Sequence, residues 1–279
     1  MGCCPDRPTV RYSLPFETEP RTRNREEDPM SIQRLACLLA SVFALLTALP
    51  CEGADMADFR FYGFSRDGSH LAWEQYGIQD GSGFPWASFT IQSALTGERI
   101  ASDTLVLNLY SQGWPEAWQE QGLDALGMLR DSLLSTMGAD LDRLEIPEGA
   151  AGVALLERLE TDLSEYSTAE FVREWLGPGY SRGPRYRLTL QCDSVATEMM
   201  YMAPLVSLRI LLEGAGRELV LADDGEAGAP VAYWYHVRGV RMYADSVLAV
   251  VLSKGEPGFE GPNTRWRVVA GVLPEGLRP

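Results

Sequence analysis

Cysteine, histidine and lysine are scarce in this chain of 279 residues, which holds 5 cysteines, 2 histidines and one lysine. Two histidines cannot supply a three-histidine zinc site within one chain. All the cysteines except Cys192 lie within the first 53 residues, so the rest of the chain cannot form an intramolecular disulfide. Cys192 shares a period-two face with Tyr186, Leu188 and Leu190. We therefore expect a buried, unreactive thiol at this position.

The chain also has few basic residues, with 24 Lys and Arg against 39 Asp and Glu and a formal net charge of −15. A surface this acidic repels phosphate backbones and anionic membranes, so we expect no nucleic-acid partner. Hydrophobic residues make up 46% of the chain and charged residues 23%. These proportions are typical of a globular protein and exclude disorder throughout the chain.

Only one long hydrophobic run is present, at residues 35–50, with the sequence LACLLASVFALLTALP. As a helix it would span about 24 Å, which is less than the roughly 30 Å of a bilayer core. Arg34 precedes the run and small residues follow it, as in a secretory signal peptide. We expect residues 30–53 to be a signal peptide and residues 1–29 to be a non-native upstream extension or disordered. A protein processed in this way is periplasmic or secreted and keeps no stable membrane span.

Residues 54–279 are expected to form one secreted α+β domain. Its first part alternates like strands, as in Phe59 and Phe61, and Asp67-Gly68 is a typical hairpin turn. Further strands are expected at residues 70–76, around Phe89, and at residues 104–109, which gives a four-stranded antiparallel meander. The meander is similar to one propeller blade, but no second copy follows, so a single sheet is predicted.

The middle of the chain, about residues 115–176, is expected to be a helical insertion that packs on the sheet. Leu129, Leu133 and Met137 recur at helical spacing, a second helix is expected within residues 151–163, and residues 167–170 match a capping box. Alternating or continuous apolar runs then predict C-terminal strands at residues 185–192, 204–213, 218–222, 231–243, 246–253 and 265–272. The predicted fold is α+β and predominantly antiparallel β, with a blade-like N-terminal meander, C-terminal strands and a helical middle.

Three sequence phrases, in this order, resemble a bacterial family of predicted secreted proteins, the domain of unknown function 2259. They are FRFYGFSRDGSHLAWEQYGIQDGSGFPW, YWYHVRGVRMYADSVLAVVL and PGFEGPNTRWRVV. The similarity runs through most of residues 57–273. The resemblance implies an exported single-domain protein. It implies no catalytic residue, cofactor or substrate, because the family has no assigned function.

A weak catalytic pattern is the G-x-S-x-G motif around Ser181, followed by Asp223 or Asp224 and then by His236 in the chain order of hydrolases. A nucleophile elbow needs a strand before the serine and a helix after it. Here a helix is predicted before Ser181 and a strand after it, and Pro178 and Pro184 flank the motif. We therefore expect a loop. The acidic residues 223–226 lack the glutamate that an EF-hand needs at its twelfth position, and we interpret them as a surface turn. We expect no metal site and no cofactor.

Two glycine-rich loops are the stronger candidates for a binding surface, since function is often found on loops that a rigid sheet positions. The candidate binding residues come from the loop at residues 79–86 and from residues 254–265: Asp80, Ser82, Phe84, Trp86, Phe259, Glu260 and Arg265. The leading hypothesis is a non-enzymatic binding module of the cell envelope, whose partner is an envelope protein, a glycan or a small ligand. The alternatives are a hydrolase that uses carboxylates such as Asp80 and Glu260, and a structural envelope component whose loops only plug the edge of the core.

Overall fold

The computed structural model describes residues 54–108, 125–159, 166–175, 181–195, 204–225, 232–258 and 261–279. The expected signal peptide, the upstream extension and residues 115–124 of the expected helical insertion lie outside the described residues. Residues 52–279 form one compact unit, which contains all of the secondary structure given below. In the described part of that unit no helix is both long and apolar enough to cross a membrane.

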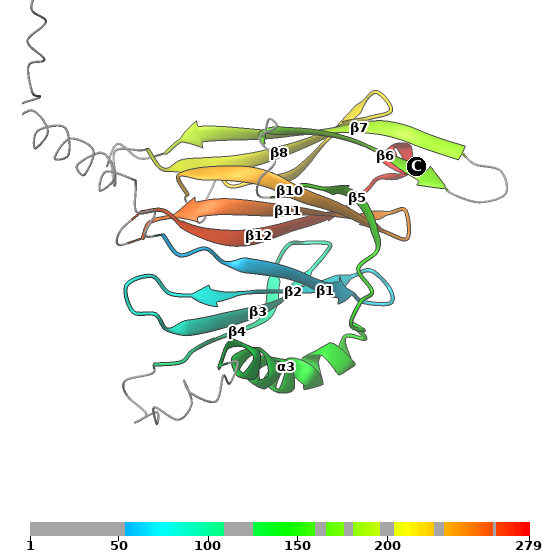
Figure 1. Cartoon of the computed structure of the whole chain (residues 1–279). Coiled ribbons are helices and arrows are strands. Elements are labelled where there is room, and N and C mark those ends of the chain that lie inside the picture. Colours follow the sequence, from blue (N-terminus) through cyan, green and yellow to red (C-terminus); the bar gives the residue numbers. More distant parts are fainter. Residues whose placement is uncertain are drawn as a thin grey trace, which may run out of the picture. The chain divides into compact units, whose positions relative to one another are not determined.

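The first sheet is an antiparallel meander of four consecutive strands, β1 (Asp58–Phe64), β2 (His70–Ile78), β3 (Pro85–Ser93) and β4 (Arg99–Val106), in this order (Figure 1). It confirms the predicted meander, although β4 begins five residues before the predicted Thr104. The β1–β2 turn uses Asp67-Gly68 as expected. Gly68 has a φ of +72°, and the Asp67 carboxylate accepts hydrogen bonds from the Ser65 and Ser69 hydroxyls.

The second sheet lies in the middle of a stack of three, and its antiparallel strand order is β12-β11-β10-β5. These strands are β5 (Val153–Glu157), β10 (Trp234–Tyr243), β11 (Val247–Glu256) and β12 (Asn263–Val272). β11 is buried on both faces, as its continuous apolar run predicts. Leu248, Val250 and Leu252 belong to one hydrophobic cluster, whereas Val247 and Ala249 belong to another on the opposite face.

The third sheet covers one face of the middle sheet and has the order β6-β7-β8-β9. Its strands are β6 (Thr168–Trp175), β7 (Ser181–Ser194), β8 (Val206–Gly214) and β9 (Arg217–Asp223). Tyr186, Leu188 and Ile210 pack against the middle sheet and are fully buried. Cys192 lies on the same side of β7, but near its end, and is exposed. The prediction of a buried thiol was therefore wrong, although Leu208, the register partner of Cys192 on β8, is 1% exposed.

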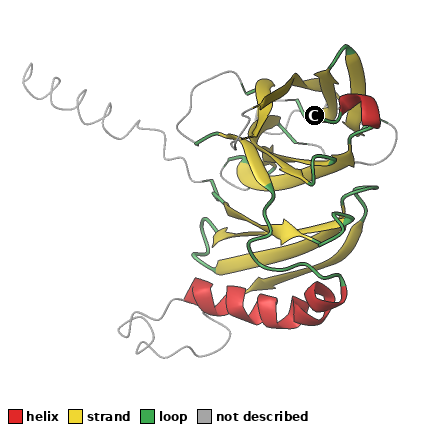
Figure 2. Cartoon of the chain, turned by 90° about the vertical axis from the view of Figure 1, so that its right-hand side faces the viewer, coloured by secondary structure: helices red, strands yellow, loops and turns green. Residues whose placement is uncertain are grey.

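One helix, α3 (Ala125–Arg143), covers the outer face of the first sheet (Figure 2). Leu129, Leu133, Met137 and Leu141 recur every four residues, and this stripe packs against Ala87, Phe89 and Ile91 of β3 together with other residues of the sheet. The described layers are therefore helix, sheet, sheet, sheet. The predicted β-rich fold is confirmed, but the helical part is much smaller than the predicted residues 115–176.

Two segments that were predicted to be helical are strands. Residues 153–157 form β5, which pairs with the edge of β10, and the capping-box segment lies in β6, which pairs with β7. In β6, Ala169 and Phe171 are buried and alternate with exposed Glu170, which is strand spacing. A local capping pattern cannot detect a pairing partner that is distant in sequence, and here tertiary pairing outweighs local propensity.

Candidate ligand-binding cleft

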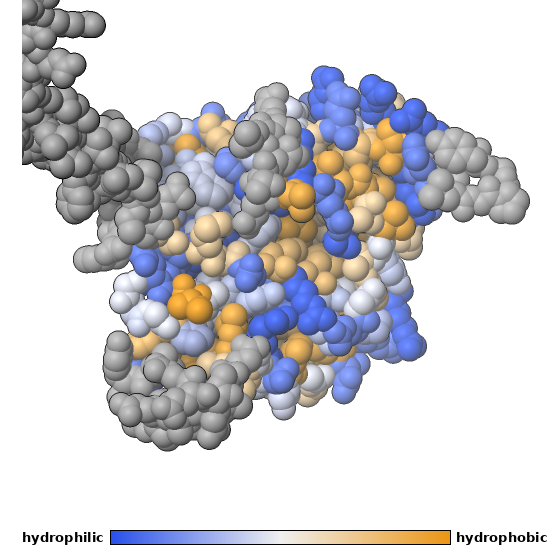
Figure 3. Space-filling view, in the orientation of Figure 1, coloured by the Kyte–Doolittle hydropathy of each residue, from blue (hydrophilic) through white to orange (hydrophobic). Residues whose placement is uncertain are grey.

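A cleft of about 920 Å³ opens along β12, the edge strand of the middle sheet. The first sheet forms one wall through β3 and β4, and β9 of the third sheet forms the other. This volume is within the range of small-molecule sites, about 300–1,000 Å³. Figure 3 shows one face of the molecule in the orientation of Figure 1. Hydrophobic residues gather in the middle and upper part of this face, and hydrophilic residues surround them.

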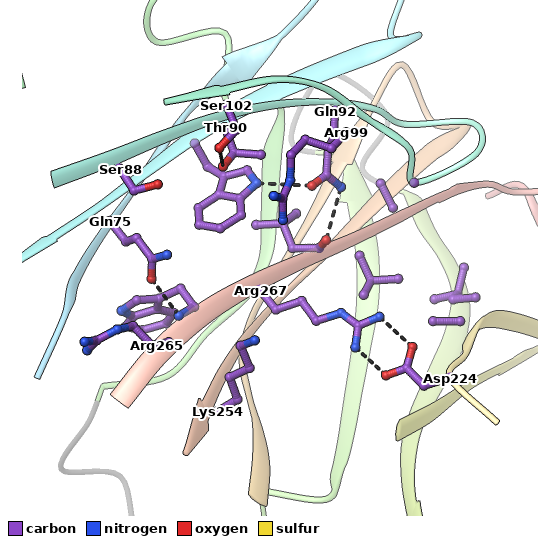
Figure 4. Close-up of a pocket in the computed structure, with 18 of the residues that line it drawn as sticks. Gln75, Ser88, Thr90, Gln92, Arg99, Ser102, Asp224, Lys254, Arg265 and Arg267 are labelled. Carbon is purple, nitrogen blue, oxygen red and sulfur yellow. Dashed lines mark hydrogen bonds and ion pairs between the residues drawn. The ribbon is translucent and has the colours of Figure 1, made fainter. Parts of the chain in front are cut away.

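One wall of the cleft is rich in hydroxyl groups. Ser88 and Thr90 of β3 alternate with Ala87, Phe89 and Ile91, which face α3, and therefore point to the opposite side. Ser102 and Thr104 lie opposite them on β4, with Thr90 Oγ1 3.4 Å from Ser102 Oγ and the Thr104 hydroxyl donating to Ser88 Oγ at 3.0 Å. We call these four residues, Ser88, Thr90, Ser102 and Thr104, the hydroxyl wall. Figure 4 labels the first three of them.

Two glutamine side chains join the hydroxyl-wall sheet to the edge of β12. The Gln92 amide donates to the Val268 carbonyl at 3.1 Å and accepts from the Trp73 indole at 3.2 Å. The Gln75 side-chain oxygen accepts the Trp266 backbone N–H at 3.0 Å. The bonds to the Val268 carbonyl and to the Trp266 N–H each satisfy a backbone group of an edge strand that would otherwise lack a partner. The two glutamines therefore fix the position of β12 over the first sheet (Figure 4).

Most cationic side chains of the cleft are paired within the described residues. Arg267 makes two hydrogen bonds to Asp224, at 2.5 and 2.8 Å, and Lys254 pairs with Glu256. Burial would lower the pKa of Arg267, but the hydrogen bond and the charge of Asp224 outweigh burial and raise it. The Asp224 side chain is 7% exposed, whereas Asp223 and Gly225 are exposed, so the expected acidic surface turn fits these neighbours but not the Asp224 side chain.

Arg99 differs from these cations, because no residue in the described ranges forms an ion pair with it. It is exposed at the start of β4 and lines the cleft. In a chain of net charge −15, this guanidinium is an uncompensated positive charge beside the hydroxyl wall. The cleft can therefore offer neutral hydroxyl and amide hydrogen bonds together with one cationic contact.

Two of the seven predicted binding residues, Trp86 and Arg265, line the cleft. The Arg265 guanidinium lies 4.5 Å from the centre of the Trp86 ring, a cation–π distance. Arg265 also donates to the buried carboxylate of Asp55 at 2.9 Å. Asp55 accepts the backbone N–H of Asp80 as well, so one carboxylate joins the first predicted loop to β12.

Asp80, Ser82 and Phe84 of the first predicted loop do not line the cleft. The Ser82 hydroxyl donates to the Gln79 side chain at 3.0 Å, and the Gln79 N–H donates to the Phe84 carbonyl at 2.9 Å. Residues 79–84 thus form a turn closed on itself, with Gly81 at a φ of +74°. Phe259 and Glu260 lie outside the described residues. The proposed carboxylate pair of Asp80 and Glu260 stays a hypothesis for that reason.

The register of the strands separates the three catalytic candidates. Ser181 begins β7, whereas Asp223 pairs with Arg209, which pairs with Gln191 ten residues further along β7. At about 3.3 Å per residue, Ser181 and Asp223 are about 30 Å apart. His236 lies on β10 in another sheet, stacked between Tyr166 and Trp234 at ring-centre distances of 4.3 and 4.4 Å.

His236 should make the protein less stable as the pH falls from about 6.5 to about 4. Burial, followed by the charge of Arg238, lowers its pKa to about 4, and its Nδ1 has no hydrogen-bond partner in the described residues. The unfolded chain takes up a proton near pH 6.5 while the folded chain does not, so acid favours unfolding across this interval. The ring is only half-buried, and we expect a loss of about 1–2 kcal/mol.

Urea unfolding at pH 7.0, 5.5 and 4.5 measures this loss. His236→Phe keeps an aromatic ring in the stack but cannot take up a proton, so its free energy of unfolding should depend less on pH. An equal pH dependence in both proteins, or a His236 titration midpoint near 6.5 by NMR, would contradict the prediction.

Sequence reasoning did not find the hydroxyl wall, the two glutamines or Asp55. Polar residues do alternate in the β3 sequence WASFTIQS, but that pattern is equally typical of a solvent-facing strand. The described residues contain no cluster of three or more His, Cys, Asp and Glu side chains arranged to hold a metal ion.

Comparison with protein families gives one match. The model of a family described as predicted secreted protein (DUF2259) matches residues 72–271, which is most of the chain. The chain belongs to the DUF2259 family. The match begins within β2 and ends within β12, so the DUF2259 region includes nearly all strand residues that line the cleft. Searches of curated proteins and of solved structures returned no match.

Membership in DUF2259 confirms the family that the three sequence phrases resemble. It also identifies the chain as an exported protein, as the hydrophobic run at residues 35–50 suggested. The family description gives no reaction, ligand or partner.

Proposed function

We propose that this exported protein is a non-enzymatic binding protein, and that the cleft along β12 takes a polar, elongated ligand. The observation that carries the proposal is the hydroxyl wall. On β2 and β3, the inner face carries Trp73 and Trp86 against the middle sheet, as a packed core requires. Further along the same face it changes to Ser88 and Thr90, and Ser102 and Thr104 follow on β4.

The change from indole to hydroxyl side chains occurs beside β12, the edge strand of the middle sheet. Hydroxyl and amide groups at such a place give directional hydrogen bonds to a ligand, and the neighbouring indoles give apolar contact area. The cleft also runs along a strand rather than forming a round pocket, which favours an elongated ligand. A purely structural envelope component would not need a polar cleft of this volume.

A bulky residue in the hydroxyl wall should abolish ligand binding without unfolding the protein. Ser102 is exposed on the edge strand β4, so Ser102→Trp places an indole in the cleft at little cost in stability. We expect a ligand found by thermal-shift screening of peptides, oligosaccharides and small polyols to bind at least tenfold more weakly to this variant. Isothermal titration calorimetry measures the change.

Ser135→Trp is the matched control, since it makes the same substitution on the exposed surface of α3, away from the residues that line the cleft. It should bind like the wild type. Equal affinity of the wild type and Ser102→Trp for every ligand found would show that the cleft is not the binding site. Turnover of any screened compound would contradict a non-enzymatic role.

A further inference from the structure

The backbone groups on the outer edge of β12 can be assigned residue by residue. In a strand, the N–H and C=O of one residue point to the same side, and successive residues alternate. Ala57 N–H donates to Thr264 O, Gln75 binds Trp266 N–H and Gln92 binds Val268 O, all from outside the middle sheet. The even-numbered residues of β12 therefore point away from β11, towards the cleft.

The first half of this edge is already covered. Residues 55–57, which we call the N-terminal strap, form a parallel bridge between Met56 and Thr264, and Thr264 N–H donates to Asp55 O at 2.7 Å. The two glutamines follow at Trp266 and Val268. The chain's own extended backbone thus pairs with β12 at the start of the very edge that borders the cleft.

The second half of the edge has no such cover. The structure shows no hydrogen-bond partner within the described ranges for Val268 N–H or for the N–H and C=O groups of Ala270 and Val272. All three residues line the cleft. They repeat every second residue, which is about 6.6 Å along the strand. Backbone groups left in this arrangement form a template for another strand.

We propose that the polar, elongated ligand is an extended peptide that adds to the middle sheet as a strand beside residues 268–272 of β12. The inference rests on the proposed function, since it names the ligand of the same cleft. Donors and acceptors that alternate at the strand repeat are matched by a polypeptide backbone, whereas the hydroxyl groups of a saccharide do not follow this repeat.

The walls of the cleft set the side-chain preference of such a peptide. Successive side chains of a strand point to opposite faces. One face of the added strand meets the hydroxyl wall and Arg99, and the other meets Leu219 and Leu221 of β9. We therefore expect bound peptides to alternate polar and apolar residues, with an acidic residue among the polar ones that pairs with Arg99.

Hydrogen exchange of individual amides, followed by NMR, tests the added strand directly. In the free protein the amides of Val268, Ala270 and Val272 should exchange quickly, whereas those of Arg267, Val269 and Gly271, which face β11, should be protected. The probe is a synthetic peptide selected on the protein from a displayed library of random linear heptapeptides. Its binding should protect the even-numbered amides at least tenfold.

A backbone variant separates strand addition from other contacts. Ala270→Pro removes only an outward N–H, which an edge strand tolerates, and Ala270→Ser keeps that N–H as the matched control. We expect Ala270→Pro to weaken peptide binding at least tenfold and Ala270→Ser to leave it unchanged. Val272→Pro repeats the test at a more exposed position, in case Ala270→Pro lowers stability.

Several outcomes would overturn the inference. They are the absence of any binder in the heptapeptide library, equal binding by the wild type and both proline variants, and even-numbered amides that are already protected in the free protein. The last result would show that another part of the chain or a second copy covers the edge. If a saccharide binds instead, with Ser102→Trp abolishing its binding, the strand proposal fails while the proposed function stands.

Discussion

Replacing Asp224 with alanine is expected to lower the free energy of unfolding by about 3 kcal/mol, because it leaves the Arg267 guanidinium without its counter-charge between two sheets. The pair is bidentate, the Asp224 side chain is 7% exposed and that of Arg267 is 21% exposed. For a folded unit of this size, the melting temperature should fall by about 6–12 °C. Chemical denaturation and calorimetry measure both changes.

The neighbouring Asp223 is the matched control. It pairs with Arg209 at 3.4 Å, but both side chains are more than 40% exposed, so Asp223→Ala should cost less than about 1 kcal/mol. The double variant Asp224→Leu with Arg267→Met should recover part of the lost stability, since a buried ion pair can be replaced by apolar side chains. Equal losses for Asp223→Ala and Asp224→Ala would show that burial of the pair has no energetic consequence.

The strands that could be predicted are those whose pattern is complete within a short segment. Phe59 and Phe61 alternate, Asp67-Gly68 marks a turn, and the continuous run in β11 indicates burial on both faces. Every one of these signals depends on residues within about ten positions of one another. The meander and most C-terminal strands were predicted correctly for that reason.

The segments that were misassigned depend on distant partners. β5 adds to the free edge of β10 from about 80 residues away, and nothing in residues 153–157 indicates that edge. Cys192 is likewise exposed although its register partner Leu208 is buried, and period-two spacing does not indicate this difference. Periodicity shows which side chains share a face, but it does not show what covers that face.

The cleft, like the misassigned strands, could not be predicted from local sequence patterns. The sequence predicted a binding surface on two glycine-rich loops, but the cleft is formed mainly by strand residues. Trp86 and Arg265 are the predicted binding residues that line it. The cleft exists because β12 is the last strand of its sheet, and strand order cannot be obtained from local spacing. Asp55 was missed because it comes directly after the expected signal peptide, where no motif marks it.

The position of signal-peptide cleavage decides whether the contacts of Asp55 at the cleft are kept. Its carboxylate receives Arg265 and the N–H of Asp80, and its carbonyl accepts from Thr264 on the same edge strand that the proposed peptide would extend. A processing enzyme that cut after Asp55 would remove all of these contacts. A cut at the end of the expected signal peptide, after residue 53, retains them. With residues 30–53 removed as expected from the sequence, the N-terminal strap would stay in the exported protein.

Glu74 should be the most sensitive position in the first sheet, because its buried carboxylate joins the sheet to α3. It is 2% exposed and accepts from Arg130 Nε at 3.1 Å and Nη2 at 2.5 Å, and from Arg60 at 3.4 Å. The Arg130 guanidinium also lies 4.0 Å from the centre of the Tyr76 ring. Glu74→Gln keeps the shape but removes the charge, so two guanidinium groups lose their common partner. We expect a loss of about 3 kcal/mol in unfolding free energy, measured by urea denaturation.

The loss should also be local, since Arg130 lies on α3 while its partner lies on β2. Limited proteolysis should cut α3 earlier in Glu74→Gln than in the wild type, because local opening follows the weakest packing. Glu148→Gln is the control: Glu148 also pairs with Arg60, but its side chain is 58% exposed, so its removal should cost less than about 1 kcal/mol. If the two variants were equally stable, the helix would be held by the apolar contacts of Leu129, Leu133 and Met137 alone, and the buried carboxylate would need another explanation.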